Sequence, residues 1–314
     1  MRAVVMEKFG GPEVLRLAEV PDLEPRVAHE VLRVTRAGVN WADVHTRTDS
    51  YLAPMTLPCV PGNEVVGRAP DGRRLLALTR GGGYAEQAHA HRRVSWEIPD
   101  DISDDQALPL ALQGQAAWHL LFTVAGVRPG ESVLIPAAAG GVGSMAVQLA
   151  HAAGARVVAL ASTEEKRQLA LDLGAAAAVD STAEELADRV VEAAGGPVQA
   201  ALEMTGGRVL RQTLGALAPR GRVAVYGYVG GRLTDLPTRL LLEKSITVSG
   251  FWLPHLYGDR AALSAGVEAL FGAVRTGALR PVTGGLYPLA EAAAAHSALA
   301  SRTHLGKLAL NTAA

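Results

Sequence analysis

The segment from Ser132 to Ala153 limits the possible folds of this chain more than any other. Its first part, Ser132–Pro136, is a short apolar run typical of a buried parallel strand. Residues 137–143 read Ala-Ala-Ala-Gly-Gly-Val-Gly, and apolar residues then recur at helical spacing as far as Ala153. The pattern predicts a strand, a tight turn and a helix whose N-terminal N–H groups face an anion such as a pyrophosphate.

The turn differs in one place from the G-x-G-x-x-G pattern of dinucleotide sites, because Ala138 stands where the first glycine is usual. Glycines in such a turn let the backbone approach a pyrophosphate closely. A turn of this kind also occurs without a ligand, so the prediction depends on the strand that comes next in the chain. We expect the cofactor to contact Ala139, Gly140, Gly141, Val142 and Gly143.

A second apolar strand is expected at 156–160, and its end bears on the choice of cofactor. Proteins that bind NAD usually place an acidic residue there to hold the ribose 2′-hydroxyl. This chain has Ala161 and Ser162, with Lys166 and Arg167 shortly after. A small hydroxyl and a cation suit a 2′-phosphate, so the sequence favours NADP(H) over NAD, with Ser162 and Lys166 near the phosphate.

Strand-like and helical segments alternate from residue 132 to residue 250, which predicts a doubly wound parallel sheet of the Rossmann type. Residues 1–100 instead alternate short strands with glycine and proline turns, which indicates a compact β-rich domain. A length of 314 residues suits two domains. We expect an α/β protein, with one domain formed by residues 1–112 and 252–314 and a nucleotide domain by residues 113–251.

The composition excludes several classes of partner and site. The formal net charge is −1, which indicates neither nucleic acid nor a membrane surface as a partner. A single cysteine excludes a disulfide framework and a thiolate zinc cluster. No apolar run approaches the roughly 20 residues of a membrane span, and the first residues lack a signal-peptide pattern. These features predict a cytoplasmic enzyme.

Several motifs match one family. They read Ala37-Gly-Val-Asn40-x-x-Asp43-x-x-x-Arg47-x-x-x-Tyr51, Pro61-Gly62-x-Glu64-x-x-Gly67, Gly221-Arg-Val-x-x-Tyr226-Gly227 and Ser301-Arg302-x-x-x-Gly306-Lys307. With them the chain resembles, over almost its full length, the zinc-independent quinone oxidoreductase branch of the medium-chain dehydrogenase/reductases. The resemblance implies a GroES-like β-rich catalytic domain beside the NADP(H)-binding Rossmann domain and an active site between the two. It also implies a homodimer formed along the nucleotide sheet, with residues 245–250 as its edge strand.

The resemblance also implies that no metal takes part. In the zinc enzymes of this superfamily a cysteine and a histidine of the first domain bind the metal. The matching places here hold Gly38 or Asn40, and Asn63. A tetrahedral zinc site needs sulfur or imidazole ligands, which these residues do not supply. Hydride transfer to an electron-poor carbon needs less assistance than alcohol oxidation, so the expected substrate is a quinone or an α,β-unsaturated carbonyl.

The family motifs assign roles to further residues. Asn40, Arg47 and Tyr51 are the candidates for contact with the hydride acceptor. The alternatives are that Asn40 holds a turn and that Arg47 binds a surface carboxylate. For the cofactor, the resemblance implies that Tyr226 lies beside it, and the alternative is that Tyr226 is only a packed aromatic residue. Phe251 would face the amide of the nicotinamide. Arg302 would belong to a clamp that binds a phosphate.

The function that we expect is an NADPH-dependent, metal-free reductase of quinones or α,β-unsaturated carbonyls. One alternative is an enoyl reductase acting on a natural-product or acyl-thioester intermediate, for which Arg68, Arg73, Arg74 and Arg80 would form a basic track for coenzyme A. An alternative of another class is a non-catalytic NADPH-binding protein. The sequence does not distinguish among these three.

Overall fold

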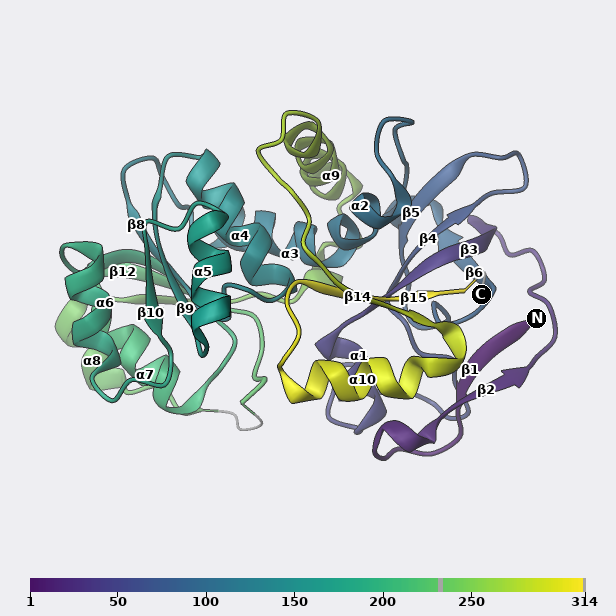
Figure 1. Cartoon of the computed structure of the whole chain (residues 1–314), viewed down its shortest axis with the longest axis horizontal. Helices are drawn as coiled ribbons and strands as arrows, with labels where there is room; N and C mark the ends of the chain where they lie inside the picture. The colour runs from purple at the N-terminus through teal and green to yellow at the C-terminus, as the bar shows by residue number, and fades with distance from the viewer. Residues whose placement is uncertain (231–233, 313–314) are drawn as a thin grey trace. The chain divides into compact units, whose positions relative to one another are not determined.

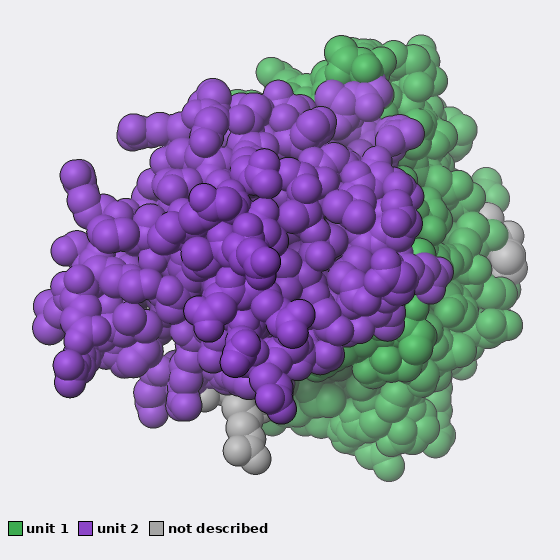
Figure 2. Space-filling model, turned by 60° about the vertical axis from the view of Figure 1, so that its left-hand side comes forward, with its two compact units in different colours: residues 1–113, 256–276, 281–314 green, residues 114–255, 277–280 purple. Residues whose placement is uncertain are grey.

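The computed structural model describes residues 1–230 and 234–312, which form two compact units coloured separately in Figure 2. Unit 1 comprises Met1–Gln113, Leu256–Thr276 and Pro281–Ala314, and unit 2 comprises Gly114–His255 and Gly277–Arg280. Each unit has its own sheet and its own hydrophobic core. No helix within the described residues is long and apolar enough to cross a membrane.

Unit 2 contains a parallel sheet whose six described strands lie in the order β10-β9-β8-β11-β12-β13. This order reverses direction between β8 and β11, which defines the topological switch point of a doubly wound sheet. The α/β class and the Rossmann-type sheet predicted from the sequence are therefore confirmed. The strands are β8 (Ser132–Ile135), β9 (Arg156–Ala161), β10 (Ala177–Asp180), β11 (Val198–Glu203), β12 (Leu217–Val225) and β13 (Thr247–Gly250).

The central strands of this sheet are apolar throughout because helices cover both faces of such a sheet. Residues 133–135 of β8 and 157–160 of β9 are all buried. Capping signals mark two helix ends in unit 2: the Thr163 hydroxyl accepts a backbone N–H at the start of α5, and the left-handed Gly195 follows α6. The longer helices of unit 2 are α4 (Gly141–Ala152), α5 (Glu164–Asp172), α6 (Leu186–Ala194), α7 (Gly207–Ala216) and α8 (Thr238–Lys244).

A continuous helical stretch runs from residue 104 to residue 124 and crosses from unit 1 into unit 2. It begins at α2 (Asp104–Pro109), where Ser103 and Gln106 form a capping box. Two π-helical segments, Leu110–Gly114 and His119–Val124, flank α3 (Gln115–Trp118). The sequence of this stretch carries no local pattern that predicts the π-helical segments.

Unit 1 is built on a second sheet, in which β3 is the central strand. Its described strands follow the order β14-β15-β3-β4-β5-β7, and β6 pairs with β3 as well. Figure 1 shows the last strand, β15, in yellow against β3, so the end of the chain completes the sheet of its first part. The strands are β3 (His29–Val39), β4 (Glu64–Arg68), β5 (Arg74–Leu78), β6 (Gln87–His91), β7 (Ser95–Glu97), β14 (Thr283–Pro288) and β15 (Lys307–Asn311), and β1 (Arg2–Met6) pairs separately with β2 (Leu15–Glu19).

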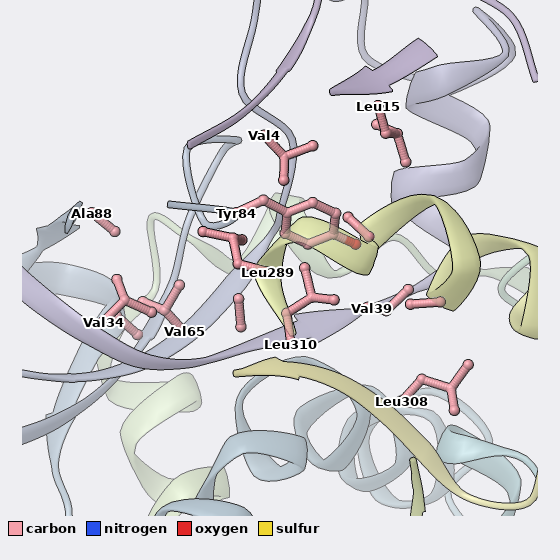
Figure 3. Packing of buried hydrophobic residues seen from close by; sticks show 14 of the residues in the cluster. Val4, Leu15, Val34, Val39, Val65, Tyr84, Ala88, Leu289, Leu308 and Leu310 are labelled. Atoms are coloured by element: carbon pink, nitrogen blue, oxygen red, sulfur yellow. The ribbon is translucent and has the colours of Figure 1, made fainter. Parts of the chain in front are cut away.

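The core of unit 1 lies between this sheet, the β1–β2 pair and two helices. Figure 3 shows Tyr84 surrounded by apolar side chains, among them Val4, Leu289 and Leu310. Tyr84 is fully buried, and burial of a large apolar side chain contributes roughly 1.5–3 kcal/mol. The helices of unit 1 besides α2 are α1 (Trp41–Arg47), α9 (Arg260–Arg275) and α10 (Ala292–Ser301), and α10 buries Ala292 and Ala295 of its alanine run.

Candidate functional site

The glycine turn follows β8 and ends where α4 begins. Gly140 precedes α4 without a side-chain cap, and the residues Gly140, Gly141 and Val142 are partly exposed. A Cβ atom on Gly143 would lie 2.2 Å from the carbonyl oxygen of Ala137, so only glycine fits there. The first N–H groups of an α-helix have no partner within the helix, and an uncapped start is suited to bind an anion.

The five predicted turn residues therefore differ in what they can do. Gly140, Gly141 and Val142 are partly exposed, whereas Ala139 and Gly143 are buried. Gly143 allows α4 to pack tightly against the turn. Position 143 therefore requires glycine for packing. This packing supports the part of the turn that is open to a ligand.

The end of β9 lies next to the glycine turn, because β8 and β9 are adjacent and parallel. Ser162 is exposed there and Lys166 is partly exposed on the first turn of α5. The guanidinium of Arg167 pairs with Glu164 at 2.7 Å and with Asp180 at 3.5 Å. Ser162 and Lys166 thus lie together at this edge, while two carboxylates already offset the charge of Arg167.

Glu203, at the end of β11, is a further candidate site residue, which the sequence analysis did not single out. Its Oε1 atom accepts hydrogen bonds from the backbone N–H groups of Thr205, at 2.5 Å, and Gly206, at 2.8 Å. The side chain is buried, and burial raises the pKa of the carboxyl. The sequence feature that could have drawn attention to Glu203 is an acidic residue at the end of an apolar strand. Glu203 and the glycine turn occupy the carboxyl ends of β11 and β8, on either side of the switch point.

Tyr226 and Phe251 follow β12 and β13 at the same carboxyl edge of the sheet. The Tyr226 N–H donates to the Glu203 carbonyl at 2.9 Å, and the Phe251 N–H donates to the Val225 carbonyl at 2.8 Å. Burial raises the pKa of the Tyr226 phenol, and the Glu203 carboxyl adds to the shift. The ring of Phe251 stacks on His119 with centroids 6.3 Å apart.

In unit 1, Asn40 belongs to a buried polar cluster. Its Nδ2 atom donates to Glu64 Oε1 at 2.9 Å, and its Oδ1 atom accepts from Lys307 Nζ at 2.7 Å and from Gln113 Nε2 at 3.3 Å. Asn40 is 4% exposed. Both the oxygen and the nitrogen of the Asn40 amide already form hydrogen bonds within the protein. A hydride acceptor that contacts Asn40 must therefore share or displace one of these partners.

A second buried cluster is joined to the first through the backbone of Asn40. The Asn40 N–H donates to Asp43 Oδ2 at 2.8 Å, and Asn63 Nδ2 donates to Asp43 Oδ1 at 2.6 Å. The Tyr84 hydroxyl lies 3.1 Å from Asp43 Oδ2 and 3.0 Å from His296 Nε2. Burial raises the pKa of Asp43 to about 6 and lowers that of His296 to about 3. This cluster fixes the start of α1, and with it the position of Asn40.

Arg47 ends α1 and points into unit 1. It is 4% exposed, and its Nη1 atom donates to the Gly10 carbonyl at 2.6 Å. Burial lowers the pKa of its guanidinium. Among the described residues Arg47 forms no ion pair with a carboxylate, although the negative charge of exposed Glu13 acts on its pKa in the opposite direction to burial. Its Nε atom has no hydrogen-bond partner within the described part of the chain.

Tyr51 lies after α1 and is partly buried. Its phenol is close enough to Tyr257 to contribute to the raised pKa of that residue, for which burial is the larger cause. The guanidinium carbon of Arg80 lies 5.4 Å from the centre of the Tyr257 ring. Tyr51 thus belongs to an aromatic and cationic surface of unit 1.

Arg302 follows α10 with a left-handed backbone, φ 56°, and its guanidinium lies 5.6 Å from the Trp41 ring. It belongs to unit 1, whereas Ser162 and Lys166 belong to unit 2. A role in a phosphate clamp stays a prediction.

The places that match zinc ligands in the metal-dependent relatives hold Gly38 or Asn40, and Asn63, and both asparagine side chains form hydrogen bonds within the protein. Asn63 donates to Asp43, and Asn40 donates to Glu64. No group of three or more His, Cys, Asp or Glu side chains suited to a metal ion occurs in residues 1–230 and 234–312.

A doubly wound sheet with a glycine turn beside its switch point, joined in one chain to a β-rich unit, defines the architecture of a two-domain nucleotide-dependent oxidoreductase. A family model described as "Zinc-binding dehydrogenase" matches residues 141–270, a range that includes neither Asn40 nor Asn63.

Relatives extend the similarity to the whole chain. The quinone oxidoreductase of Rattus norvegicus is 32% identical over 99% of this chain and 97% of its own length. The 2-haloacrylate reductase of Burkholderia sp is 32% identical over 98% of each chain. The quinone oxidoreductase of Thermus thermophilus, solved also as its complex with NADPH, is 37% identical, covers 99% of this chain and 100% of its own, and has a TM-score of 0.91. The chain belongs to the zinc-independent quinone oxidoreductase branch of the medium-chain dehydrogenase/reductase superfamily, a family of oxidoreductases.

Proposed function

We propose that this protein is an NADPH-dependent reductase that transfers a hydride to quinones or α,β-unsaturated carbonyls. The observation that carries the proposal is the uncapped, partly exposed glycine turn beside the switch point of the sheet. The names of its relatives support the choice of acceptor, since they describe quinone oxidoreductases and a reductase of an unsaturated acid.

The residues of unit 2 fit the proposed cofactor. The N–H groups at Gly141 and Val142 would bind the pyrophosphate, because they open α4 without a side-chain cap. Tyr226 and Phe251 would flank the cofactor at the carboxyl edge of the sheet. When bound, NADPH would supply the hydride.

Ser162 and Lys166 would bind the 2′-phosphate at the end of β9. Two carboxylates near this edge, Glu164 and Asp180, are paired with Arg167, whose single positive charge offsets part of their negative charge. The hydroxyl of Ser162 and the ammonium group of Lys166 would supply the favourable contacts to a phosphate placed there.

The residues of unit 1 would position and polarise the acceptor. Tyr51 is the best candidate for a hydrogen bond to the acceptor carbonyl. Asn40 is held in place by hydrogen bonds with Glu64, Lys307 and Gln113. Its side chain would therefore offer the acceptor a preorganised dipole with little freedom to move. Solvent would supply the proton that completes reduction, since we assign no side chain as proton donor.

A panel of acceptors tests this proposal. We expect the full chain to consume NADPH with a quinone or a neutral 2-enone, measured as loss of absorbance of the reduced nicotinamide. Turnover with acyl thioesters alone would favour the enoyl reductase alternative. NADPH binding without turnover on any acceptor would leave only the non-catalytic alternative.

We also propose a homodimer formed through β13, the edge strand of the unit 2 sheet. Residues 247–250 pair on one side with β12 and are partly or fully exposed, and Leu242 on α8 exposes 82% of its surface. Unpaired edges of this kind accept a second strand. Light scattering should give the mass of a dimer, and Val248→Lys should shift it to that of a monomer.

A further inference from the structure

A cavity of about 380 Å³ is lined entirely by residues of unit 1, whereas the glycine turn belongs to unit 2. Its lining includes Arg80, Arg93 and three histidines, His29, His89 and His91. A second cavity of about 500 Å³ shares three of these residues, His29, His89 and Arg80. Volumes of this size accommodate small organic ligands.

The sheet brings the three imidazoles together. His29 begins β3 and lies opposite His91 of β6, and His89 lies two residues earlier on β6, on the same face. The ring centroid of His29 is 4.7 Å from that of His91 and 5.8 Å from that of His89. Three residues that are cationic when protonated therefore line one wall.

The two arginines of this cavity are not neutralised by acids. In the described residues, neither Arg80 nor Arg93 forms an ion pair with a carboxylate, whereas Arg73 pairs with both Asp71 and Glu30. The pKa of His91 is lowered, first by burial and then by the positive charge of its neighbours, the two arginines among them. Mutual repulsion of this kind is relieved when an anion binds.

The hydrogen bonds of His91 prepare it as a donor. Its Nδ1 atom accepts the Arg93 N–H at 3.1 Å, which leaves the proton of the neutral ring on Nε2. Arg80 is held over the Tyr257 ring at 5.4 Å, which limits its conformations while leaving its N–H groups able to bind a ligand. One imidazole donor and two guanidinium groups are well suited to bind phosphate oxygens.

We propose that this pocket binds the phosphate group of a small phosphate ester, through residues that are all distinct from those assigned to the cofactor. The residues that make the contacts are Arg80, Arg93 and His91, with His29 and His89 adding positive charge when protonated. The proposal does not depend on the reductase activity, because none of these five residues is a candidate for contact with NADPH or with the hydride acceptor, although Arg80 also belongs to the basic track considered for coenzyme A.

Calorimetric titration of the full chain with pyrophosphate tests the proposal, with malonate and chloride as comparison anions at matched ionic strength. We expect saturable pyrophosphate binding that is at least about tenfold weaker in the double variant Arg80→Gln/Arg93→Gln. Arg16→Gln, which removes an exposed charge on β2, should leave the affinity unchanged. His91→Phe should also weaken binding, and all variants should keep the wild-type thermal midpoint.

The site of pyrophosphate binding must be distinguished from the glycine turn, so Gly143→Ala, whose Cβ atom would displace that turn, is titrated in parallel. If pyrophosphate binding is lost in Gly143→Ala and retained in Arg80→Gln/Arg93→Gln, the anion binds in unit 2 and the proposal is overturned. Absence of saturable binding to the wild-type chain also overturns it. Malonate binding as tight as that of pyrophosphate overturns the assignment to phosphate.

Discussion

The ammonium group of Lys307 donates to the Oε1 atom of Glu64, and neither side chain exposes more than 3% of its surface. Glu64 lies on β4 and Lys307 on β15, so this ion pair joins the first part of the chain to its last strand. The Glu64 Oε2 atom also accepts the Leu112 N–H at 2.9 Å. The pair is therefore well hydrogen-bonded in the interior of unit 1 and holds Asn40 in place.

Lys307→Met should strongly destabilise the protein, because it leaves the Glu64 carboxylate buried without its counter-ion. Loss of one partner of a buried pair costs about 3–5 kcal/mol. Urea unfolding measures the change. The matched control is Arg239→Met, since Arg239 pairs with Glu243 on the surface of α8 with 90% of its side chain exposed, and an exposed pair contributes about 0–1 kcal/mol. Equal effects of the two substitutions would contradict the account of the buried pair.

Gly143→Ala should abolish NADPH binding, because its Cβ atom would collide with the Ala137 carbonyl and displace the turn. Calorimetry with NADPH measures the affinity. Gly272→Ala is the control, since the structure shows no atom within 4 Å of the added Cβ. That change lies within α9 and should stabilise the protein by roughly 0.5–1 kcal/mol. A folded Gly143→Ala variant with wild-type affinity would show that the turn does not form the cofactor site.

Tyr51→Phe should lower kcat/KM by a factor that corresponds to about 1–3 kcal/mol, the cost of a lost buried hydrogen bond. The affinity for NADPH should hardly change, because Tyr51 lies in unit 1 and the cofactor residues of the turn lie in unit 2. Tyr287→Phe on β14 serves as the control. Steady-state kinetics on the best acceptor measure the effect, and wild-type turnover of the variant would show that Tyr51 only packs.

His296 should make the protein less stable in acid. Burial lowers its pKa from 6.5 to about 3, so the unfolded chain binds a proton that the folded chain does not accept. This contribution is complete above the unfolded pKa and is lost as the pH falls from 6.5 towards 3. His296→Gln keeps a hydrogen-bonding partner for the Tyr84 hydroxyl and removes the titration. Asp43 acts in the opposite direction, since its raised pKa reduces stability as the pH increases from about 4 to 6.

Unfolding free energies measured across this range should therefore fall more steeply in acid for the wild-type chain than for His296→Gln. Parallel curves for the two proteins would mean that His296 does not titrate as described. The contribution of Asp43 is common to both and cancels in the difference.

The parts of the fold that could be predicted were those with a local signal. β8 and β9 consist mainly of apolar residues that are buried, and the glycine turn follows β8 directly. β14 was not predicted, because its sequence, Thr-Gly-Gly-Leu-Tyr-Pro, consists largely of residues typical of turns. Its pairing with β15 supplies hydrogen bonds that the local sequence does not indicate.

The candidate site was predicted less completely, because its contacts also join residues that are far apart in the sequence. Lys307 and Glu64 are separated by 243 residues, so no local pattern reveals that they pair. Asn40 was recognised from its motif, but the partners that saturate its amide come from β4, from β15 and from the helical stretch after α2. Glu203 gave a weak signal that was overlooked. Contacts between side chains that are far apart in the sequence can be identified only from the three-dimensional structure.

An isotope experiment tests whether a hydride passes from NADPH to the acceptor carbon. The full chain is incubated with a 2-enone and NADPH that carries deuterium at C4 of the nicotinamide, on each face in turn, and the product is analysed by mass spectrometry. The account predicts one deuterium at the β-carbon of the product from one of the two labelled faces and none from the other. Reduced product without deuterium from either face, or NADPH consumed without any reduced product, would contradict it.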